Sequence, residues 1–406
     1  MNIKSIVRLL IPKSIRIKLR QYERMSRSKI YPIIKNPHEE FEILYHIKDA
    51  TWETVYAPAI YGIAKERIAT GMWPAEDIFL IKNGIVCCAS DTIRISKGVW
   101  WNKYNDNDFV TCATPADSNV LSFNRETITI CPNRKKIKLA GKTLSLIGVF
   151  SNAWSHFLFE FVSKMYYAGE AGLLNQDVFL LTDDYNDSNI DDVINNYIIS
   201  FPKVKRITAD RKTDYECEEL ICMRETASNY NDVNFYLFQP FIIPNNVTKM
   251  VHKYVVEPYI QKIKNRTAKY TKIYLSRHTN RILNNTEEVE EYFKNLGFYF
   301  VEGKELSLEE KADLFYHAEI VVGPHSSAWQ NLIFCNKAKC LMFCNYRYVE
   351  EVVFSTMAKE NVESWLNVTG FDDDYSRRSN YTISLERIKA AYDLLINNKE
   401  HKPLQE

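Results

Sequence analysis

Short apolar runs alternate with helical patterns throughout the second half of the chain. The predicted strands are Lys272–Leu275, Phe298–Val301, Ile320–Val322 and Cys340–Phe343. Helices are predicted between and after them, over Thr286–Asn295, Ser307–His317 and Tyr348–Asn361. In the first helix, apolar residues recur at the three- and four-residue spacing of an α-helix. The alternating strand–helix order predicts a parallel, doubly wound α/β sheet.

The first half of the chain has a more mixed pattern. Strands are predicted at Ile78–Lys82, Ile85–Ala89, Thr92–Ser96, Thr127–Ile130, Val178–Leu181 and Leu220–Met223. Several of the early strands suit antiparallel pairing, and helices are predicted from Ser151 onward and over Ile190–Ile199. One ring of Trp100-Trp101 at most can stack on a sugar, because adjacent strand residues face opposite sides. Packing in the core is the simpler expectation for both.

These patterns divide the chain into four parts. Residues 1–30 form a basic segment, and residues 31–244 form an N-terminal domain that ends in a linker at Phe241–Pro244. Residues 245–384 form a second domain, which opens with a long amphipathic segment, Val247–Ile263. The helix in residues 385–406 is expected to cross back to the first domain. With 406 residues, 46% of them hydrophobic, the chain is long enough for two cores.

The strand that begins at Ile320 runs into the segment Gly323-Pro324-His325-Ser326-Ser327-Ala328, with Asn331 shortly after it. A helix that starts here directs free backbone N–H groups and the positive end of its dipole at one spot. Short side chains there let a phosphate come close. Taken alone, the segment fits an ordinary βα turn with a serine cap equally well.

Two arginines, Arg277 and Arg281, directly follow the strand Lys272–Leu275. Guanidinium groups suit phosphate oxygens, and ligands of parallel sheets bind at the carboxyl ends of the strands. A phosphate-bearing ligand is therefore expected near these arginines and the His325 turn. The sequence contains no G-x-G-x-x-G turn and no Walker-type loop, which disfavours a dehydrogenase or a nucleotide hydrolase.

A second candidate site lies in the first half, where His156 and Glu160 stand four residues apart at the start of a predicted helix. This spacing places both side chains on one helix face, where they can bond each other or converge on one substrate atom. The alternative is an ion pair on the helix surface. The neighbouring residues are mainly apolar, which favours a functional pair, and partial burial makes a carboxylate a better base.

Charge is concentrated at the N-terminus. Residues 1–30 hold nine lysines and arginines and one glutamate, although the whole chain has a net charge of only +1. Apolar residues are interleaved with the basic ones, and Pro12 divides the segment into two expected helical pieces. This pattern favours binding to an anionic membrane surface, the alternative being a disordered or docked basic terminus. No basic run elsewhere indicates nucleic-acid binding.

Cysteine usage bears on the compartment. The chain has nine cysteines, an odd number at irregular spacing. This usage favours a reducing compartment and no structural zinc.

In their order and spacing, these motifs resemble glycosyltransferase family 61. The residues that carry the resemblance are Ile273–Arg277, Arg281, Asn284, Leu296–Phe298, Ala318–His325 and Asn331–Phe334, and the His156–Glu160 spacing is similar to a further family motif. The chain departs from the family at Ser326-Ser327-Ala328-Trp329, where Gly-Ala-Gly-Leu is usual, and at Asn285, where an acidic residue is common. Trp329 is expected to crowd or stack on the donor.

The resemblance implies a GT-B-like fold, with two Rossmann-like domains facing a cleft. It implies an inverting, metal-independent hexosyl- or pentosyltransferase that takes a nucleotide sugar and needs no cofactor. Glu160 is the first candidate for the base and His156 the second; the implied donor-binding residues are Arg277, Arg281, His325, Ser326, Ser327, Ala328 and Asn331. The family includes bacterial capsule enzymes, so the expected acceptor is a capsule- or lipopolysaccharide-type glycan. The enzyme is expected to be cytoplasmic and peripheral on the inner face of the cell membrane, where the acceptor would be lipid-linked.

Other functions stay open at this point. Asp183-Asp184 after a predicted strand, and the Asp-x-Asp of Asp372–Asp374, are the kind of motif with which GT-A enzymes hold a divalent cation. Asp183 and Asp184 also suit the capping of a turn. A polysaccharide pyruvyl- or phosphotransferase on a similar frame is a second alternative, and a non-catalytic glycan-assembly protein is a third.

Overall fold

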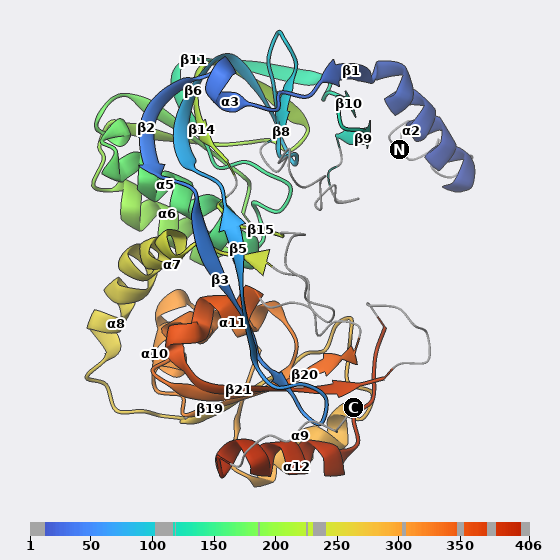
Figure 1. Ribbon diagram of the computed structural model, residues 1–406, viewed down its shortest axis with the longest axis vertical. Helices are drawn as coiled ribbons and strands as arrows, with labels where there is room; N and C mark the ends of the chain where they lie inside the picture. The colour runs from blue at the N-terminus through green and yellow to red at the C-terminus, as the bar shows by residue number, and fades with distance from the viewer. Residues whose placement is uncertain are drawn as a thin grey trace, which may run out of the picture.

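The computed structural model describes residues 13–101, 117, 119–185, 187–224, 226–229, 241–302, 306–346, 353–371 and 379–398. Two larger sheets organise the protein, one above the other in Figure 1. The upper sheet comes from the first half of the chain and the lower one almost entirely from the second half. The predicted mixed α/β class is confirmed.

The first sheet has eight strands, in the order β13-β12-β11-β14-β6-β7-β8 with β2 also beside β6. Their bounds are β2 Glu42–Lys48, β6 Glu76–Cys87, β7 Thr92–Arg94, β8 Val99–Trp101, β11 Lys135–Ser145, β12 Val178–Thr182, β13 Val204–Thr208 and β14 Thr213–Met223. The strands β11, β12, β13 and β14 pair with one another in parallel. In contrast, β6 pairs antiparallel with β14, β2 and β7. The antiparallel pairing predicted for the early strands is confirmed.

The prediction of two separate strands at Ile78–Lys82 and Ile85–Ala89 is wrong, because β6 runs through both. Asn83 and Gly84 suggest a turn in the sequence, yet the strand continues with Asn83 at φ +56°. A Cβ added at Gly84 would lie 2.9 Å from Leu220 Cδ2 on β14. The glycine therefore permits close packing between strands instead of reversing the chain.

The second sheet has six strands in the order β18-β17-β19-β20-β21-β4, and every pair in it is parallel. Their bounds are β4 Ala59–Ile60, β17 Lys272–Leu275, β18 Tyr299–Val301, β19 Ile320–Pro324, β20 Ala338–Asn345 and β21 Val362–Gly370. The parallel sheet predicted for this half is confirmed. Two of its strands were not predicted: β21, and β4, which the first half of the chain contributes.

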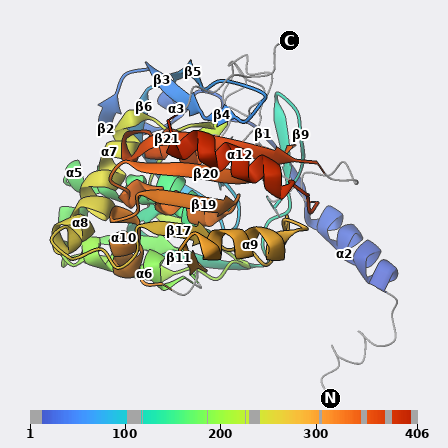
Figure 2. The same ribbon diagram turned by 90° about the horizontal axis from the view of Figure 1, so that it is seen from below.

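Helices cover both faces of the second sheet, as doubly wound folds require. α9 (Thr286–Asn295) and α12 (Leu385–Ile396) pack on one face, seen in front of the strands in Figure 2. α10 (Leu308–Tyr316) packs on the other and begins with a capping box made by Ser307 and Glu310. The terminal helix α12 was expected to cross back to the first domain. It packs on β20 and β21 of the second sheet. Its contact with the first half of the chain is made by Arg387, which donates to the Tyr61 carbonyl at 2.6 Å.

Two connections join the halves. The segment after the predicted linker is helical over α7 (Asn245–Val251), η3 (His252–Val256) and α8 (Glu257–Ile263). The hairpin of β3 (Thr51–Ala57) and β5 (Arg67–Trp73) runs down between the sheets in Figure 1. The largest apolar cluster takes residues from both sheets, and α11 (Val353–Ala358) packs on β3. The two halves therefore share a core.

Further described elements complete the first half of the chain and the connections. They are β1 Lys29–Pro32, α3 Pro37–Glu40, β9 Val120–Phe123, β10 Thr127–Ile130, η2 Leu173–Asn175, α6 Ser188–Ile198, β15 Ser228–Asn229, β16 Phe241–Ile242 and η6 Lys359–Asn361. Trp100 and Trp101 are both buried, which confirms core packing. The start of the helix predicted at Tyr348 lies outside the described residues, as does Asp372–Asp374; the eight described cysteines are buried free thiols.

Helix α2 (Lys13–Arg27) extends from the small sheet β1-β10-β9 into solvent (Figures 1 and 2). Arg134 forms an ion pair with Glu23, and Arg27 Nη1 donates to the Pro132 carbonyl at 3.0 Å. These contacts attach the carboxyl end of the helix to the body, whereas residues 1–12 lie outside the described range. Among the described helices, none is both long enough and apolar enough to cross a bilayer.

Candidate functional site

The strand order of the second sheet reverses between β17 and β19, and this is where doubly wound sheets bind ligands. Arg277 follows β17, and His325 follows β19. Gly323, at φ +151°, brings the two strand ends together, since a Cβ there would lie 2.5 Å from the Leu275 carbonyl oxygen. Glycine is therefore required at this position.

Arg277 connects the two strand ends. Its Nη1 donates to the His325 carbonyl at 2.8 Å, and its Nε donates to the carbonyls of Thr279 and Asn280 at 3.1 and 2.6 Å. The sequence suggests a direct phosphate ligand, but in this structure the guanidinium group also braces the His325 turn.

Arg281 is half-buried and lies close to Arg277. Asn280 and Arg281 both have positive φ, +50° and +54°, which turns the chain sharply after β17. Burial raises the pKa of the Tyr381 hydroxyl, and the charges of Arg277 and Arg281 act against that rise. Both guanidinium groups therefore lie near this phenol, and the structure brings the two predicted arginines together.

The turn after β19 continues into η4 (Ser327–Phe334), which is a 3₁₀ helix and not the predicted α-helix. The His325 amide donates to Phe343 at 2.8 Å, and its buried ring lies 5.6 Å from the ring of Phe354. Ser327 is exposed, and Ala328 is half-buried. The turn lies at the end of β19, as the sequence predicts. Because a 3₁₀ helix has three residues per turn, its side chains point in other directions than those of the predicted α-helix.

Three side chains of this turn hold buried polar atoms that have no hydrogen-bond partner within the described part of the chain. They are Ser326 Oγ, Gln330 Oε1 and Asn331 Oδ1. The residues are 8%, 1% and 3% exposed. Buried polar groups are nearly always satisfied in native proteins, so these three atoms give the turn open hydrogen-bonding capacity.

Trp329 does not face a donor. The side chain is fully buried, its Nε1 donates to the Pro324 carbonyl at 2.9 Å, and its ring lies 5.3 Å from that of Trp365. The expectation that Trp329 crowds or stacks on the donor is wrong. On a 3₁₀ helix this residue points into the core, where it supports the turn from behind.

The second predicted pair meets directly. His156 Nδ1 and Glu160 Oε1 lie 2.5 Å apart, and the imidazole stacks on Phe150 with ring centroids separated by 4.4 Å. The Glu160 side chain is 2% exposed and that of His156 is 35% exposed. The surface ion pair considered from the sequence is therefore wrong for Glu160, which lies inside the protein.

The local helix differs from the predicted amphipathic one. It consists of a short α turn, α4 (Trp154–His156), a π turn, η1 (Phe157–Phe161), and α5 (Val162–Glu170). Every residue of η1 is buried, and so are most residues of α5. Single π turns within α-helices occur frequently at functional sites.

The loop that leads into this helix is held by Asp183, one of the two acidic residues after β12. Asp183 is fully buried and accepts from Ser151 Oγ at 2.7 Å and from the Asp184 amide at 2.9 Å. Arg211 lies 3.7 Å from its carboxylate and donates to the Val149 carbonyl. The expectation that Asp183 caps the next turn is wrong, because its carboxylate bonds across to Ser151 and the following helix is capped by Asp187. In the described residues no cluster of three or more His, Cys, Asp or Glu side chains is arranged to hold a metal.

Gln330 links the two candidate regions, and sequence reasoning missed it. Its Nε2 lies 3.4 Å from the carbonyls of Trp154 and Ser155, which begin the helix that carries His156. Elements α4 and η4 are in contact. The turn of the second sheet and the His–Glu helix of the first therefore form one continuous region.

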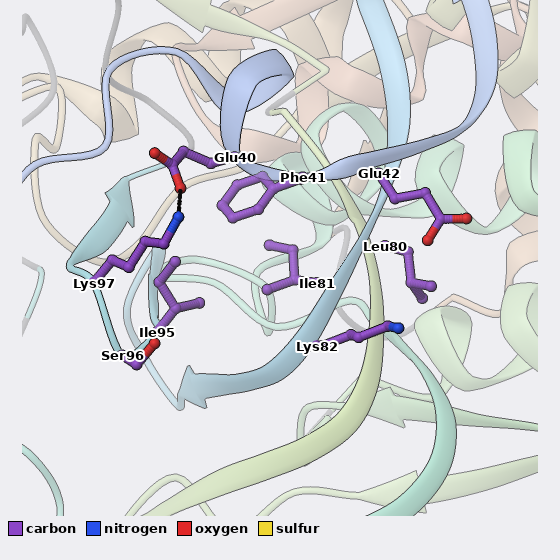
Figure 3. A pocket seen from close by; sticks show the side chains of 9 residues that line it. All are labelled: Glu40, Phe41, Glu42, Leu80, Ile81, Lys82, Ile95, Ser96 and Lys97. Carbon is purple, nitrogen blue, oxygen red and sulfur yellow. Dashed lines mark hydrogen bonds and ion pairs between the residues drawn. The ribbon is translucent and has the colours of Figure 1, made fainter.

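Two surface cavities lie elsewhere. One, of about 230 Å³, lies beside β2 and β6 with the Glu40–Lys97 ion pair at its rim (Figure 3). The other, of about 390 Å³, lies between β4, β21 and the end of α12. None of the predicted site residues lines either of them.

An α/β protein with a parallel sheet, arginines at its switch point and a partly buried His–Glu pair in the same region has the parts of a group-transfer enzyme. The family model described as Glycosyltransferase 61 matches residues 154–342, a stretch that includes His156, Glu160, Arg277, Arg281 and the His325 turn. The match confirms the resemblance to glycosyltransferase family 61 over this stretch of the chain, and it supports a glycosyltransferase. No curated protein matches it.

Proposed function

We propose that the protein is an inverting glycosyltransferase that moves a sugar from a nucleotide donor to a hydroxyl of a glycan acceptor. The observation that carries the proposal is the contact of the His156–Glu160 helix with the His325 turn through Gln330. A base and a diphosphate site are then adjacent. We further propose that the two sheets act as the two halves of a GT-B-type enzyme.

In the proposed reaction, the His–Glu pair takes the proton from the acceptor hydroxyl as that oxygen attacks the anomeric carbon from the face opposite the leaving diphosphate. Glu160 was the first candidate for the base. Its burial and its bond to Nδ1 also support a second assignment, in which Glu160 orients the imidazole and the more exposed His156 takes the proton at Nε2. In both assignments the two residues act as one unit.

The leaving diphosphate is proposed to lie against Arg277, Arg281 and the His325 turn, where Ser326 and Asn331 supply hydrogen bonds. The buried Ser326 hydroxyl supports this placement, because it can donate to a phosphate oxygen. Gln330 Oε1 and Asn331 Oδ1 are acceptors, and hydroxyl groups of the nucleotide sugar can donate to them. Positive charge and oriented dipoles stabilise a leaving phosphate without a metal. Metal independence is therefore part of the proposal.

The test is a panel of nucleotide sugars and glycan acceptors, read by thermal shift and by NMR of the product. A stabilising nucleotide sugar and a product of inverted anomeric configuration are expected, with activity unchanged by EDTA. Stabilisation by a different donor class, such as a pyruvyl donor, would contradict the proposal. Loss of activity in EDTA with rescue by manganese would contradict its metal independence.

We also propose that α2 brings the enzyme to an anionic membrane surface, on the inner face of a bacterial cell membrane, where a capsule- or lipopolysaccharide-type glycan is the acceptor. Ile15, Leu19, Tyr22 and Met25 recur at three- and four-residue spacing and are 48%, 55%, 75% and 68% exposed. Basic residues lie between them. An apolar stripe flanked by positive charge suits such a surface.

The membrane proposal is tested by co-sedimentation with phosphatidylglycerol-containing and neutral vesicles. Full-length protein is expected to bind the anionic vesicles, and Leu19→Glu/Tyr22→Glu is expected to abolish binding. Ile199→Glu, which alters an equally exposed apolar residue outside α2, is the matched control. Equal loss in the control, or no loss in the double variant, would contradict a role for α2.

A further inference from the structure

The π turn beneath the His–Glu pair is braced from another part of the chain. A π turn replaces i→i−4 hydrogen bonds by i→i−5 bonds, and here the Val162 amide donates to the Phe157 carbonyl. Phe161 takes up the distortion, with φ −127°. Such a turn leaves helix carbonyls whose usual partners have shifted, and these need other donors.

Thr226, which follows β14, supplies one such donor. Its hydroxyl donates to the Phe159 carbonyl at 2.5 Å, and it accepts from Ser163 Oγ at 2.8 Å. Thr226 is 3% exposed and Ser163 is fully buried. The two hydroxyls form a short chain that ties the π turn to the segment after the central strand of the first sheet.

Phe159 immediately precedes Glu160 in the chain. A bond that fixes the Phe159 carbonyl fixes the peptide from which the Glu160 side chain extends. The Glu160 carboxylate in turn meets His156 Nδ1 at 2.5 Å. A change of a few tenths of an ångström in this peptide therefore acts on the His–Glu distance.

We propose that Thr226 is a positioning residue, which holds the π turn so that Glu160 orients the His156 ring. The inference rests on the proposed function, since it assigns Thr226 a part in the transfer reaction. Thr226 acts on the pair indirectly, through the Phe159 carbonyl. Its hydroxyl is the required group, and its methyl group is not.

The test compares Thr226→Val, which keeps the shape and removes the hydroxyl, with Thr226→Ser, which keeps the hydroxyl. Thr226→Val is expected to lower kcat by about 10- to 100-fold with little change in donor KM, because misplacement acts on the reacting groups. Thr226→Ser is expected to retain near-normal kcat. Ser163→Ala, which removes only the second hydroxyl of the chain, is expected to give a smaller loss.

Thr213→Val is the matched control for the loss of a buried threonine hydroxyl. Thr213 is fully buried, and its Oγ1 donates to Asp210 at 3.0 Å, on β14 but away from the π turn. This variant is expected to lower the melting temperature without changing kcat. A fall in kcat as large as that of Thr226→Val would show that general destabilisation explains the effect, and would overturn the proposal.

A second readout does not depend on turnover. The short His156–Glu160 bond is expected to give a downfield imidazole N–H proton signal that His156→Asn removes and that Thr226→Val shifts or broadens. Retention of both the signal and kcat in Thr226→Val would overturn the proposal. If the wild type transfers no sugar, the proposed function fails, and the proton signal alone then decides whether Thr226 positions the pair.

Discussion

The two regions that meet at the candidate site differ in how completely their polar groups are satisfied. Around His156 and Glu160, the hydrogen bonds that hold the pair are all formed: Asp183 with Ser151, Thr226 with the Phe159 carbonyl, and Glu160 with His156. Farther along this helix, the Tyr166 and Tyr167 hydroxyls have no partner in the described chain, and neither does Trp154 Nε1 at its start. In the His325 turn, buried oxygens of Ser326, Gln330 and Asn331 have no partner in the described chain. The hydrogen bonds that position the His–Glu pair are therefore formed within the protein, whereas the His325 turn keeps hydrogen-bonding capacity open.

This difference indicates a division of labour. Groups that must hold a reacting geometry gain from a preformed network, because preorganisation avoids rearrangement during reaction. Groups that must bind a large polar ligand have to leave hydrogen-bonding capacity open, at a cost of about 1–3 kcal/mol for each buried unsatisfied group. The contrast predicts that variants of the first region lose rate and that variants of the second lose affinity.

The largest effect is expected for the His–Glu pair. Glu160→Gln and His156→Asn should each lower kcat by about 10²- to 10⁴-fold, the range for loss of an acid–base group, while donor affinity measured by calorimetry stays near the wild-type value. The double variant should be little worse than either single variant, since the residues act as one unit. Wild-type kcat in either single variant would remove the pair from the reaction.

Arg277 should give the next largest effect, and in affinity instead of rate. Arg277→Ala removes a positive charge and the brace on the His325 carbonyl, so donor Kd should rise by about 10- to 100-fold. Arg277→Lys keeps the charge but not the planar fork, and should recover only part of the loss. Full recovery by lysine, measured by calorimetry, would show that the brace is unimportant.

The unsatisfied side chains should give smaller changes that separate binding from stability. Ser326→Ala and Asn331→Leu remove polar atoms with no partner in the described chain, so the melting temperature without ligand should stay level or rise. Donor Kd should nevertheless rise, by about 3- to 10-fold. A matched Ser151→Ala, which breaks a satisfied bond to Asp183, should lower the melting temperature instead.

Local sequence patterns predict several elements of the fold. The strand Lys272–Leu275, the helix Thr286–Asn295 and the strand Thr127–Ile130 are found with the predicted bounds. Their apolar period and flanking polar residues are strong signals. β21 was missed because it contains polar residues such as Asn367, which inside the structure accepts from Trp365 Nε1 at 2.9 Å. That pairing satisfies a polar residue in a way that the strand pattern does not reveal.

The candidate site was only partly visible in the sequence. The residues of each motif could be named, because the His–Glu spacing and the strand-end arginines are local. The bond of Gln330 to residues 154 and 155 joins segments about 175 positions apart, and no local pattern encodes it. The π turn lies in a run of apolar residues that only Glu160 interrupts. Such a run has no hydrophobic period that would distinguish a π turn from an α-helix. Tertiary packing decided both features.

The smallest expected effect tests whether the stability of the first sheet is separable from the chemistry at the candidate site. The buried Asp77 carboxylate, 2.8 Å from His46 Nδ1, raises the pKa of His46, with a further contribution from the exposed Asp49; His38 contacts the other oxygen of Asp77. Because the folded state holds this proton more tightly, its contribution is complete below about pH 6.5 and is lost as pH rises through the folded-state pKa. The gap in melting temperature between wild type and His46→Gln should therefore narrow from about pH 5.5 to about pH 8.5, with kcat unchanged. A gap that widens with pH would show that His46 is not held by Asp77, and a fall in kcat would place this distant cluster within the reaction after all.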